Sequence, residues 1–324
     1  MKHTLHIAYS FNDSYVQHAG ISILSLLENN QDIESIIVYI ISDSFNKINR
    51  EKINSIIKKY NREVIYFDLN TLTKDLKINT RFSRSAYGRI FIADKVKADK
   101  LIYIDSDTVV KGSLKPLLTV DISHYLVLGV QDTVNPYYLS NIGLNHSHQY
   151  INTGFLILNL KLWREKGIVR KCIDFILQYN GNPPHNDQGT INKVCAGFIK
   201  ILPAKYNVMP PMFSFKVNEI KKLFKIRFYY SQEEIDSAIA HPIIIHYTDE
   251  FFNRPWFLNC THPLKSVYLN NLKNSPWKDA PIMYKKISTN CKIQNWVYCH
   301  CSFCIYRSMV RFIEFRHRVK NKLL

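Results

Sequence analysis

Two carboxylates, Asp105 and Asp107, directly follow an apolar segment, residues 101–104, that is typical of a buried strand. In an open α/β sheet, ligands bind just beyond the carboxyl ends of the strands. Two hard oxygen ligands on one side of an extended turn can hold Mg²⁺ or Mn²⁺ and leave other coordination positions to a diphosphate. The pattern therefore predicts a divalent-metal site for a phosphorylated ligand. The alternative is an exposed turn that happens to contain two aspartates.

The same segment supports a second chemical interpretation. A strand followed by Asp-x-Asp-x-Thr-Val, here residues 105–110, resembles the first motif of the haloacid-dehalogenase-like phosphatases, in which the first Asp is the nucleophile. That family normally carries the motif on its first strand and a paired acidic metal motif downstream. In this chain the motif lies well after the first predicted strand, and no Asp-Asp or Gly-Asp-x-x-x-Asp follows it. We therefore do not favour a phosphatase.

Further polar residues are candidates for the same site. His246 ends another short apolar segment and could reach the metal, although a structural histidine is the simpler interpretation and His241 is equally available. Arg89, in Tyr87-Gly88-Arg89, is either a surface charge or the cation that a diphosphate requires.

An acid and an amide, Asp187 and Gln188, stand at the start of a predicted helix that follows two prolines. Helix N-termini attract anions and polar ligands. The alternative is that Asn186 or Asp187 simply caps the helix.

Short apolar strands alternate with amphipathic helices along most of the chain. We expect strands near 5–9, 35–41, 64–67, 101–104, 126–130 and 155–160, and helices near 21–27, 46–60, 85–97 and 162–178. Such an alternation is typical of an α/β fold with a parallel or mostly parallel sheet. We find no internal repeat and no linker of biased composition before about residue 275.

Composition limits the class of protein. The 324 residues include 43 Lys and Arg against 26 Asp and Glu, a formal charge of +17, and 46 % are apolar. This excludes a disordered or collagen-like chain. No apolar run approaches the roughly 18–20 residues of a membrane span, and residues 1–6 lack the apolar region of a signal peptide. The seven cysteines, an odd number, fit free thiols in a reducing compartment, so we expect a cytoplasmic location.

The C-terminal segment differs from the rest. Residues 277–324 carry ten Lys or Arg and two acids, a net charge of +8, interleaved with aromatic residues. This composition suits the surface of an anionic bilayer; the alternative is a helix packed on the main domain with a solvated charged face. A zinc site is not favoured, because Cys299, His300, Cys301 and Cys304 form one crowded cluster rather than two separated pairs. No nucleic-acid-binding module is present in the sequence, so nucleic acid is not an expected partner.

Taken in order, several motifs resemble those of one enzyme family. The matching residues are Ala8–Tyr15 as strand and polar turn, Tyr87 with Arg89, Asp105 with Asp107, Asn152, Gly154, Asn159 and Trp163, Asp187 with Gln188, and His246 followed by Arg254-Pro255-Trp256. This order is similar to glycosyltransferase family 8, the retaining nucleotide-sugar hexosyltransferases of the GT-A fold. Residues 270–278 with the basic aromatic tail resemble the bacterial lipopolysaccharide core α-glucosyl- and α-galactosyltransferases of that family.

The resemblance implies a role for each matching position. Asp105, Asp107 and His246 would coordinate Mn²⁺, or Mg²⁺, bridging the UDP diphosphate, and Ala8, Ser10 and Asn12 would contact the uridine. Arg89, Ser106, Asn152, Thr153, Asp187 and Arg254 would bind the rest of the donor, and Asp132 would face the acceptor. Among the catalytic residues, Gln188 would lie on the face of the sugar opposite UDP, where its amide oxygen could steady an oxocarbenium-like centre, with Asp187 and Arg89 beside it.

Two positions depart from the family pattern. The family usually has Asp where this chain has Asn12, which changes an acceptor-only contact to uracil into an amide that can also donate. The usual His-x-x-Gly-x-x-Lys-Pro-Trp is two residues longer here, with Asp249 for Gly and Arg254 for Lys.

The expectation is therefore a GT-A domain over residues 1–275 and a membrane-association segment over 276–324. The enzyme would move glucose or galactose from UDP-glucose or UDP-galactose to the lipopolysaccharide or lipooligosaccharide core at the inner face of the cytoplasmic membrane. Two alternatives remain at this stage. One is a related transferase for another cell-surface glycan or a protein, and the other is a non-catalytic, basic, membrane-associated binding protein.

Overall fold

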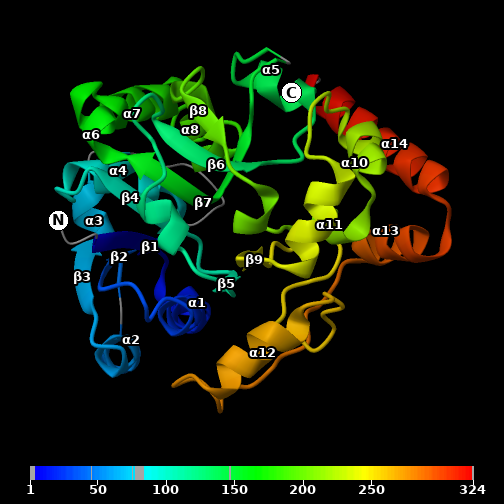
Figure 1. Ribbon diagram of the computed structural model, residues 1–324. Helices are drawn as coiled ribbons and strands as arrows, with labels where there is room; N and C mark the ends of the chain where they lie inside the picture. The colour runs from blue at the N-terminus through cyan, green and yellow to red at the C-terminus, as the bar shows by residue number, and fades with distance from the viewer. Residues whose placement is uncertain (1–3, 45, 75, 77–83, 146, 323–324) are drawn as a thin grey trace.

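A computed structural model of the chain describes residues 4–44, 46–74, 76, 84–145 and 147–322, the last six as backbone only. Residues 1–3, which belong to the N-terminal segment 1–6 discussed above, lie outside the described residues. A seven-stranded sheet in the order β3-β2-β1-β4-β7-β6-β8 forms the centre of the molecule (Figure 1). Its strands are β1 (Thr4–Ser10), β2 (Ser35–Ser42), β3 (Glu63–Asp68), β4 (Lys100–Ile104), β6 (Val127–Gln131), β7 (Ile151–Asn159) and β8 (Ile199–Ile201). A small second sheet pairs β5 (Thr108–Val110) with β9 (Ile244–His246).

The large sheet is mostly parallel, as predicted. Strands β1, β2, β3 and β4 pair in parallel, and so do β6 and β8, whereas β7 runs antiparallel to both β4 and β6. Strand β7 is longer than expected, because it already begins at Ile151.

Side chains alternate between the two faces of the sheet and form two separate cores. Ile102 and Ile104 of β4 pack into one core, and Leu101 and Tyr103 pack into the other. The first core is completed by α1 (Val16–Glu28), α2 (Lys47–Lys59), α11 (Gln232–Ala240) and α12 (Lys265–Lys273). The second is completed by α4 (Gly88–Phe91), α6 (Leu160–Glu165), α7 (Ile168–Gln178) and α8 (Asn186–Val194).

Two predicted helices are wrong in extent. The helix expected over 162–178 is two helices, α6 and α7, because Gly167 adopts a left-handed conformation with φ of 60° between them. The helix expected over 85–97 is a chain of short turns, in which the carbonyl of Ala86 accepts a hydrogen bond from Arg89 Nε at 3.0 Å. The remaining helices are α3 (Leu69–Leu72), α5 (Pro136–Asn141), α9 (Pro210–Ser214) and α10 (Val217–Phe224), with 3₁₀ turns at Asp13–Tyr15, Arg84–Tyr87, Ile92–Asp94, Lys115–Leu118 and Ala204–Tyr206.

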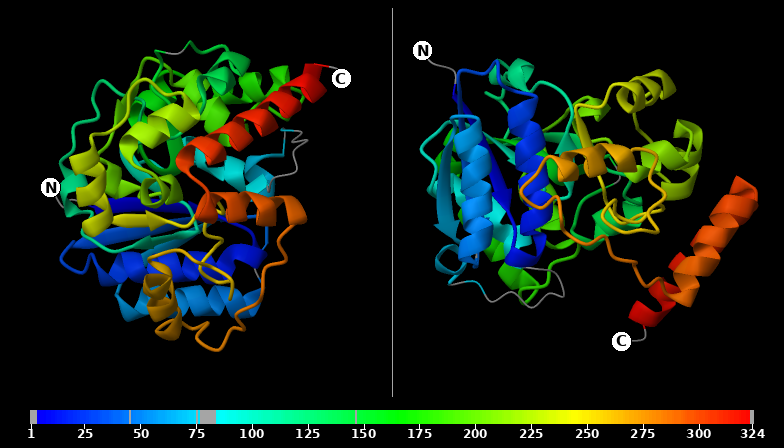
Figure 2. Two further views of the ribbon diagram at one scale, coloured as in Figure 1. Left: turned by 90° about the vertical axis from the view of Figure 1, so that its right-hand side faces the viewer. Right: turned by 90° about the horizontal axis from the view of Figure 1, so that it is seen from below.

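The C-terminal helices α13 (Thr289–His300) and α14 (Phe303–Lys322) lie on the side of the molecule away from β1, β2 and β3 (Figure 2). Apolar residues of both helices, including Tyr298 and Tyr306, pack around Phe215 on the main body. The expected helical appendage is therefore present and docked. No helix in the described part of the chain is long and apolar enough to cross a membrane. The four tail cysteines are free thiols and belong to no metal-binding group of the described residues.

Packing between α1 and α12 places a histidine in an apolar environment. His18 is buried, its Nδ1 atom lies 2.7 Å from the Tyr268 hydroxyl, and its ring stacks on Trp256 at 3.6 Å. Burial, assisted by the positive charge of Arg254, lowers the pKa of His18 to about 3. The imidazole therefore stays neutral in the folded protein at pH values where the unfolded chain binds a proton.

This histidine predicts a loss of stability in mild acid. Because the pKa is lowered on folding, the unfolded state takes up the proton first, and stability falls as the pH drops below about 6.5. We expect His18 alone to lower the unfolding free energy by about 2 kcal/mol between pH 7.5 and pH 5. Urea denaturation of the native protein and of His18→Asn at both pH values measures this difference. An unchanged pH dependence in the variant would contradict the assignment.

Candidate active site

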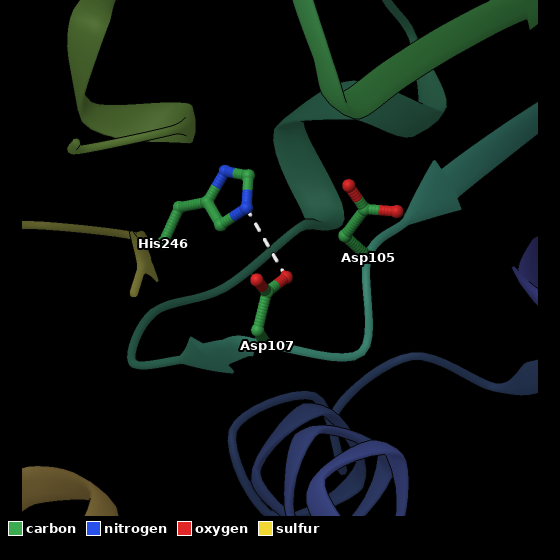
Figure 3. A group of neighbouring side chains, drawn as sticks. All are labelled: Asp105, Asp107 and His246. Atoms are coloured by element: carbon green, nitrogen blue, oxygen red, sulfur yellow. Dashed lines mark ion pairs between the residues drawn. The ribbon is translucent and has the colours of Figure 1, made fainter. Parts of the chain in front are cut away.

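Asp105, Asp107 and His246 converge at one edge of the sheets (Figure 3). Asp105 directly follows β4, Asp107 directly precedes β5, and His246 is the last residue of β9. The pairing of β5 with β9 sets Thr108 opposite His246, and the Tyr247 backbone amide donates to the Asp107 carbonyl at 2.9 Å. The small sheet thus brings a histidine from late in the chain to the two aspartates.

The cluster lies at the point where the strand order of the large sheet reverses direction. From β1 the chain runs outward through β2 and β3, and it then returns with β4 on the other side of β1. Loops at the carboxyl ends of β1 and β4 therefore diverge, which is the position at which open α/β sheets bind ligands. Asp105 stands at this point, next to the turn that follows β1.

The three side chains suit a divalent cation. One ligand atom from each lies within 4.8 Å of the others. Bonds of about 2.1 Å to a single ion keep any two ligand atoms within about 4.2 Å of each other, so a shift of a few tenths of an ångström completes the set. Two carboxylates and one imidazole are donors that Mn²⁺ accepts, whereas Mg²⁺ favours oxygen alone.

The histidine is held in the tautomer that a metal requires. His246 Nδ1 lies 3.0 Å from Asn207 Oδ1, and the Asn207 amide donates in turn to Asn152 Oδ1 at 2.9 Å. Because Asn207 presents its oxygen, Nδ1 donates its proton to it, and Nε2 is the nitrogen that faces Asp107 and would face a metal. Gly154 leaves the space for this ring, since a Cβ atom there would lie 2.2 Å from His246 Cε1.

Asp107 sits between two cationic groups. Its carboxylate lies 2.8 Å from Arg254 Nη1 and 3.2 Å from His246 Nε2. Burial would raise the pKa of Asp107, but the positive charges of Arg254 and His246 hold it well below its ordinary value. Burial would lower the pKa of His246, and the Asp107 carboxylate raises it above its ordinary value. Asp107 is therefore ionised and ready to bind a cation.

Arg89 links the metal edge to the inner wall of the site. The guanidinium is buried, with Nη2 at 2.7 Å from Asp105 and Nε at 3.2 Å from Asp187. Tyr103, whose ring lies under the guanidinium, donates to the same Asp105 oxygen at 3.0 Å. Burial would lower the pKa of Arg89, but the two carboxylates raise it. Burial raises the pKa of Asp187, and Arg89 opposes this increase.

Gln188 and Asp132 form the opposite wall. Gln188 Nε2 donates to Asp132 at 2.9 Å, and the Thr153 backbone amide donates to Gln188 Oε1 at 3.2 Å. Asn152 also donates to Asp132 at 3.2 Å. The helix that carries Asp187 and Gln188 begins without a side-chain cap, so neither the Asn186 nor the Asp187 capping alternative holds. Asp187 instead forms an ion pair with Arg89, and Gln188 donates to Asp132.

The residues expected to contact uridine differ in their accessibility. Ala8 is buried in the second core, and the Ser10 hydroxyl donates to the Ser85 carbonyl at 2.6 Å. Asn12 lies in the turn after β1, half-buried, and accepts a hydrogen bond from the Ser14 hydroxyl at 2.6 Å. Ser106 is buried between the two aspartates. Their roles as donor-binding residues stay predictions.

Asn207 belongs to the site but to none of the sequence motifs, whereas Tyr15 and Trp256 lie within two of them. Asn207 is fully buried and orients His246, and Tyr15 accepts a hydrogen bond from Arg254 at 3.1 Å. Trp256 stacks on His18 and lies 5.3 Å from the Arg254 guanidinium. A single polar residue such as Asn207 gives no sequence signal, because its partner lies 39 positions away.

The lengthened loop after His246 is anchored at its centre. Asp249 forms an ion pair with Lys285, and Phe251 packs against Phe215 and Tyr298. Phe251 and Asn253 adopt positive φ angles of 61° and 57°. These turns absorb the two additional residues and return Arg254 to Asp107.

Comparison with known proteins agrees with this geometry. Residues 6–260 match the family model described as glycosyl transferase family 8. The chain belongs to glycosyltransferase family 8. It is therefore an enzyme, and neither the phosphatase interpretation nor the non-catalytic binding protein is supported.

Curated relatives include several bacterial transferases. A putative glycosyltransferase of Haemophilus influenzae is 30 % identical over 64 % of this chain and 64 % of its own length. A lipopolysaccharide 1,2-glucosyltransferase of Escherichia coli is 27 % identical over 85 % of this chain and 79 % of its own. A lipopolysaccharide 1,3-galactosyltransferase of Salmonella typhimurium is 22 % identical over 86 % and 80 %.

Among solved structures, the galactosyltransferase LgtC in complex with donor and acceptor sugar analogues has a TM-score of 0.68. The match covers 89 % of this chain and 99 % of that chain at 18 % identity, so it concerns the fold. The expected GT-A fold is confirmed.

Gly154 offers a direct test of how the family 8 site is built. We expect Gly154→Ala to push the His246 ring off its position, because the added methyl group overlaps it. The affinity for Mn²⁺, measured by titration calorimetry, should fall about tenfold or more although no ligand is changed. Gly112→Ala, whose Cβ would lie 3.2 Å from Ile243 Cγ1 and away from the three candidate ligands, is the matched control. Equal Mn²⁺ affinity in both variants would contradict the proposed geometry.

Proposed function

We propose that this enzyme transfers glucose or galactose from a UDP-sugar to the core of lipopolysaccharide or lipooligosaccharide, with retention of configuration and with Mn²⁺ as cofactor. The observation that carries the proposal is the convergence of Asp105, Asp107 and His246 at the point where β1 and β4 diverge, with an arginine on each side.

Asp105, Asp107 and His246 would hold the cation. When bound, it would act as a Lewis acid for the departing UDP. Asn207 pairs with Nδ1 and so leaves Nε2 as the nitrogen directed at the two aspartates, and Gly154 leaves room for the ring. Both features favour a ligand role over a purely structural histidine.

Arg254 would bind the diphosphate. In the structure it neutralises Asp107, and its side chain is 21 % exposed beside Tyr15 and Trp256. A diphosphate brings negative charge to the same edge, and a guanidinium can bind it in a bidentate manner. Arg89, which is buried and tied to two carboxylates, would instead fix the positions of Asp105 and Asp187 around the donor sugar.

Gln188 and Asp187 would position the hexose. Asp187 accepts from Arg89 and from the Thr153 hydroxyl, which leaves it suited to holding sugar hydroxyls rather than to nucleophilic attack. Gln188 is oriented by Thr153 and Asp132, so its amide oxygen lies in a fixed place. A displacement in which the acceptor attacks from the face that UDP leaves, without a covalent intermediate, fits this pair. Retaining glycosidases, in contrast, generally use two carboxylates about 5 Å apart.

The acceptor assignment rests on the relatives and on Asp132. Two of the relatives named above act on lipopolysaccharide, and they differ in the hexose that they transfer. The choice of hexose depends on hydrogen bonds to one hydroxyl, so both donors are tested below. A transferase for another cell-surface glycan or for a protein is the second candidate, because the acceptor side of such enzymes varies.

The C-terminal helices would hold the enzyme at the inner face of the cytoplasmic membrane. Trp296 of α13 and Phe312 of α14 are 58 % and 60 % exposed. Arg311 immediately precedes Phe312, and the Arg316 guanidinium lies 6.0 Å from the centre of the Phe312 ring. Exposed aromatic side chains interleaved with basic ones bind anionic bilayer surfaces, with about 1 kcal/mol per basic residue.

The chemistry can be tested without an acceptor. We expect the enzyme to release UDP from UDP-glucose or UDP-galactose in the presence of Mn²⁺ and not in the presence of EDTA. Asp107→Ala should abolish this release, because it removes a ligand and the partner of Arg254. Asp99→Asn, a surface carboxylate with 76 % exposure, should leave it unchanged. Metal-independent release, or no release from any UDP-sugar, would overturn the proposal.

Membrane binding has its own test. The double variant Trp296→Ser, Phe312→Ser should lose most of its binding to vesicles that contain anionic phospholipid, because the exposed rings no longer insert. Ile48→Ser on α2, which is 67 % exposed on the other part of the molecule, serves as the control. Sedimentation with the vesicles measures both. Equal sedimentation of the double variant and the control would rule out the C-terminal helices as the binding surface.

A further inference from the structure

A continuous groove leads away from Asp132 on the acceptor side of the site. Its inner part has a volume of about 280 Å³ and is lined by residues that include Asp132, Tyr150, Arg227 and Phe228. Its outer part, of about 890 Å³, shares Arg227 and Phe228 and continues to Lys225. The outer volume alone is near the upper end of the range for small-molecule sites, so the groove has room for several sugar units.

The wall of the groove is firmly attached to the catalytic residues. Gln131, which immediately precedes Asp132, donates from its side chain to the Phe228 carbonyl at 2.6 Å. Its backbone amide donates to the Tyr230 hydroxyl at 2.8 Å, and that hydroxyl donates to the Leu202 carbonyl at 2.8 Å. The segment that carries Arg227 and Phe228 is thus fixed relative to Asp132 rather than being a free loop.

The groove combines an exposed aromatic ring with uncompensated positive charge. Phe228 is 64 % exposed, and the Arg227 guanidinium lies 5.2 Å from the centre of its ring. Within the described part of the chain, Arg227 forms no ion pair, and Lys193 at the outer rim donates only to the Gly143 carbonyl. The nearby Glu314 is already engaged by Lys225 at 3.5 Å and by Asn135 at 3.2 Å.

The groove continues toward the C-terminal helix. Beyond Lys225 a further depression is lined by Arg311, Glu314 and Phe315 of α14. Figure 1 shows α5, α10 and the end of α14 on the same side of the molecule, and the Glu314 contacts join α14 to the segment after Asp132. A ligand that extends outward from Asp132 therefore meets Arg227, Lys225 and Arg311 in turn.

We propose, resting on the function proposed above, that this groove binds an acceptor oligosaccharide that carries a phosphate group, with the phosphate on Arg227 and a sugar ring on Phe228. An exposed Arg without a carboxylate partner, carried beside an aromatic ring on an anchored segment, suits a phosphorylated sugar better than a neutral one. A guanidinium binds phosphate in a bidentate manner, and an aromatic face packs against the apolar face of a sugar. Arg227 would thus determine acceptor specificity without taking part in the transfer.

The test measures binding of two oligosaccharides that differ only in phosphate. The probe is lipid-free core oligosaccharide released from lipopolysaccharide by mild acid, used as isolated and after chemical dephosphorylation. Titration calorimetry on the full chain with UDP and Mn²⁺ gives the two dissociation constants. We expect tighter binding of the phosphorylated form, and we expect Arg227→Gln to weaken that form about tenfold and leave the other unchanged. Arg227→Lys should recover part of the loss, because it keeps the charge but not the planar fork.

Controls separate this inference from the proposed function. Lys58→Gln on α2 removes one positive charge elsewhere on the surface and should bind both oligosaccharides as the native protein does. UDP release without acceptor should be the same in Arg227→Gln as in the native protein. If neither protein releases UDP, the proposed function is overturned, whereas the inference about phosphate binding in the groove is not.

The remaining outcomes overturn the inference. These are equal binding of the two oligosaccharides by the native protein, an equal loss of both in Arg227→Gln, and no binding of the phosphorylated form. Another such outcome is that Arg227→Gln changes binding only when anionic vesicles are present, which would assign Arg227 to lipid headgroups instead.

Discussion

The carboxylates of Asp105, Asp107 and Asp187 are largely buried and lie close together, and the arrangement of the site depends on the cations that neutralise them. Burying a charge costs several kcal/mol unless a partner compensates it. Arg89 compensates Asp105 and Asp187, and Arg254 with His246 compensates Asp107. The two arginines are not equivalent. Arg89 is enclosed and rigid, whereas Arg254 is partly exposed and shares its guanidinium with Tyr15. Arg89 is therefore suited to holding Asp105 and Asp187 in place, and Arg254 to binding an incoming anion.

The fold supplies this charge arrangement through two separate sheets. The large sheet fixes Asp105 at the end of β4, with Leu101 and Tyr103 packed on one side and Ile102 and Ile104 on the other. The small sheet adds His246, and a single fully buried amide, Asn207, orients its ring. The C-terminal helices contribute as well, because Tyr298 packs on the loop that carries Arg254 and Glu314 contacts the segment after Asp132. The segment whose composition predicts membrane binding thus also packs against the residues that support the site.

The sequence predicted the parts of the site that belong to strand ends and ordered motifs. A run of apolar residues ending in Asp-x-Asp predicts β4 and the two carboxylates that follow it, because a buried strand and its carboxyl end are both local properties. The helix limits were less predictable. Gly167 interrupts a periodic apolar pattern by adopting a left-handed conformation. In the segment expected as a helix over 85–97, the Arg89 side chain donates a hydrogen bond to the Ala86 carbonyl. Asn207 and the groove at Arg227 could not be predicted, because their meaning depends on partners that are distant in sequence and adjacent only in the folded chain.

The central claim is that Asp105, Asp107 and His246 together bind the cation that carries the nucleotide. A crystal structure with Mn²⁺ and UDP, recorded with the anomalous signal of manganese, tests it most directly. We expect one manganese peak within bonding distance of all three side chains, with the diphosphate on the same ion and Arg254 turned from Asp107 toward the phosphates. Manganese at another position, or UDP bound with no manganese at these residues, would contradict it.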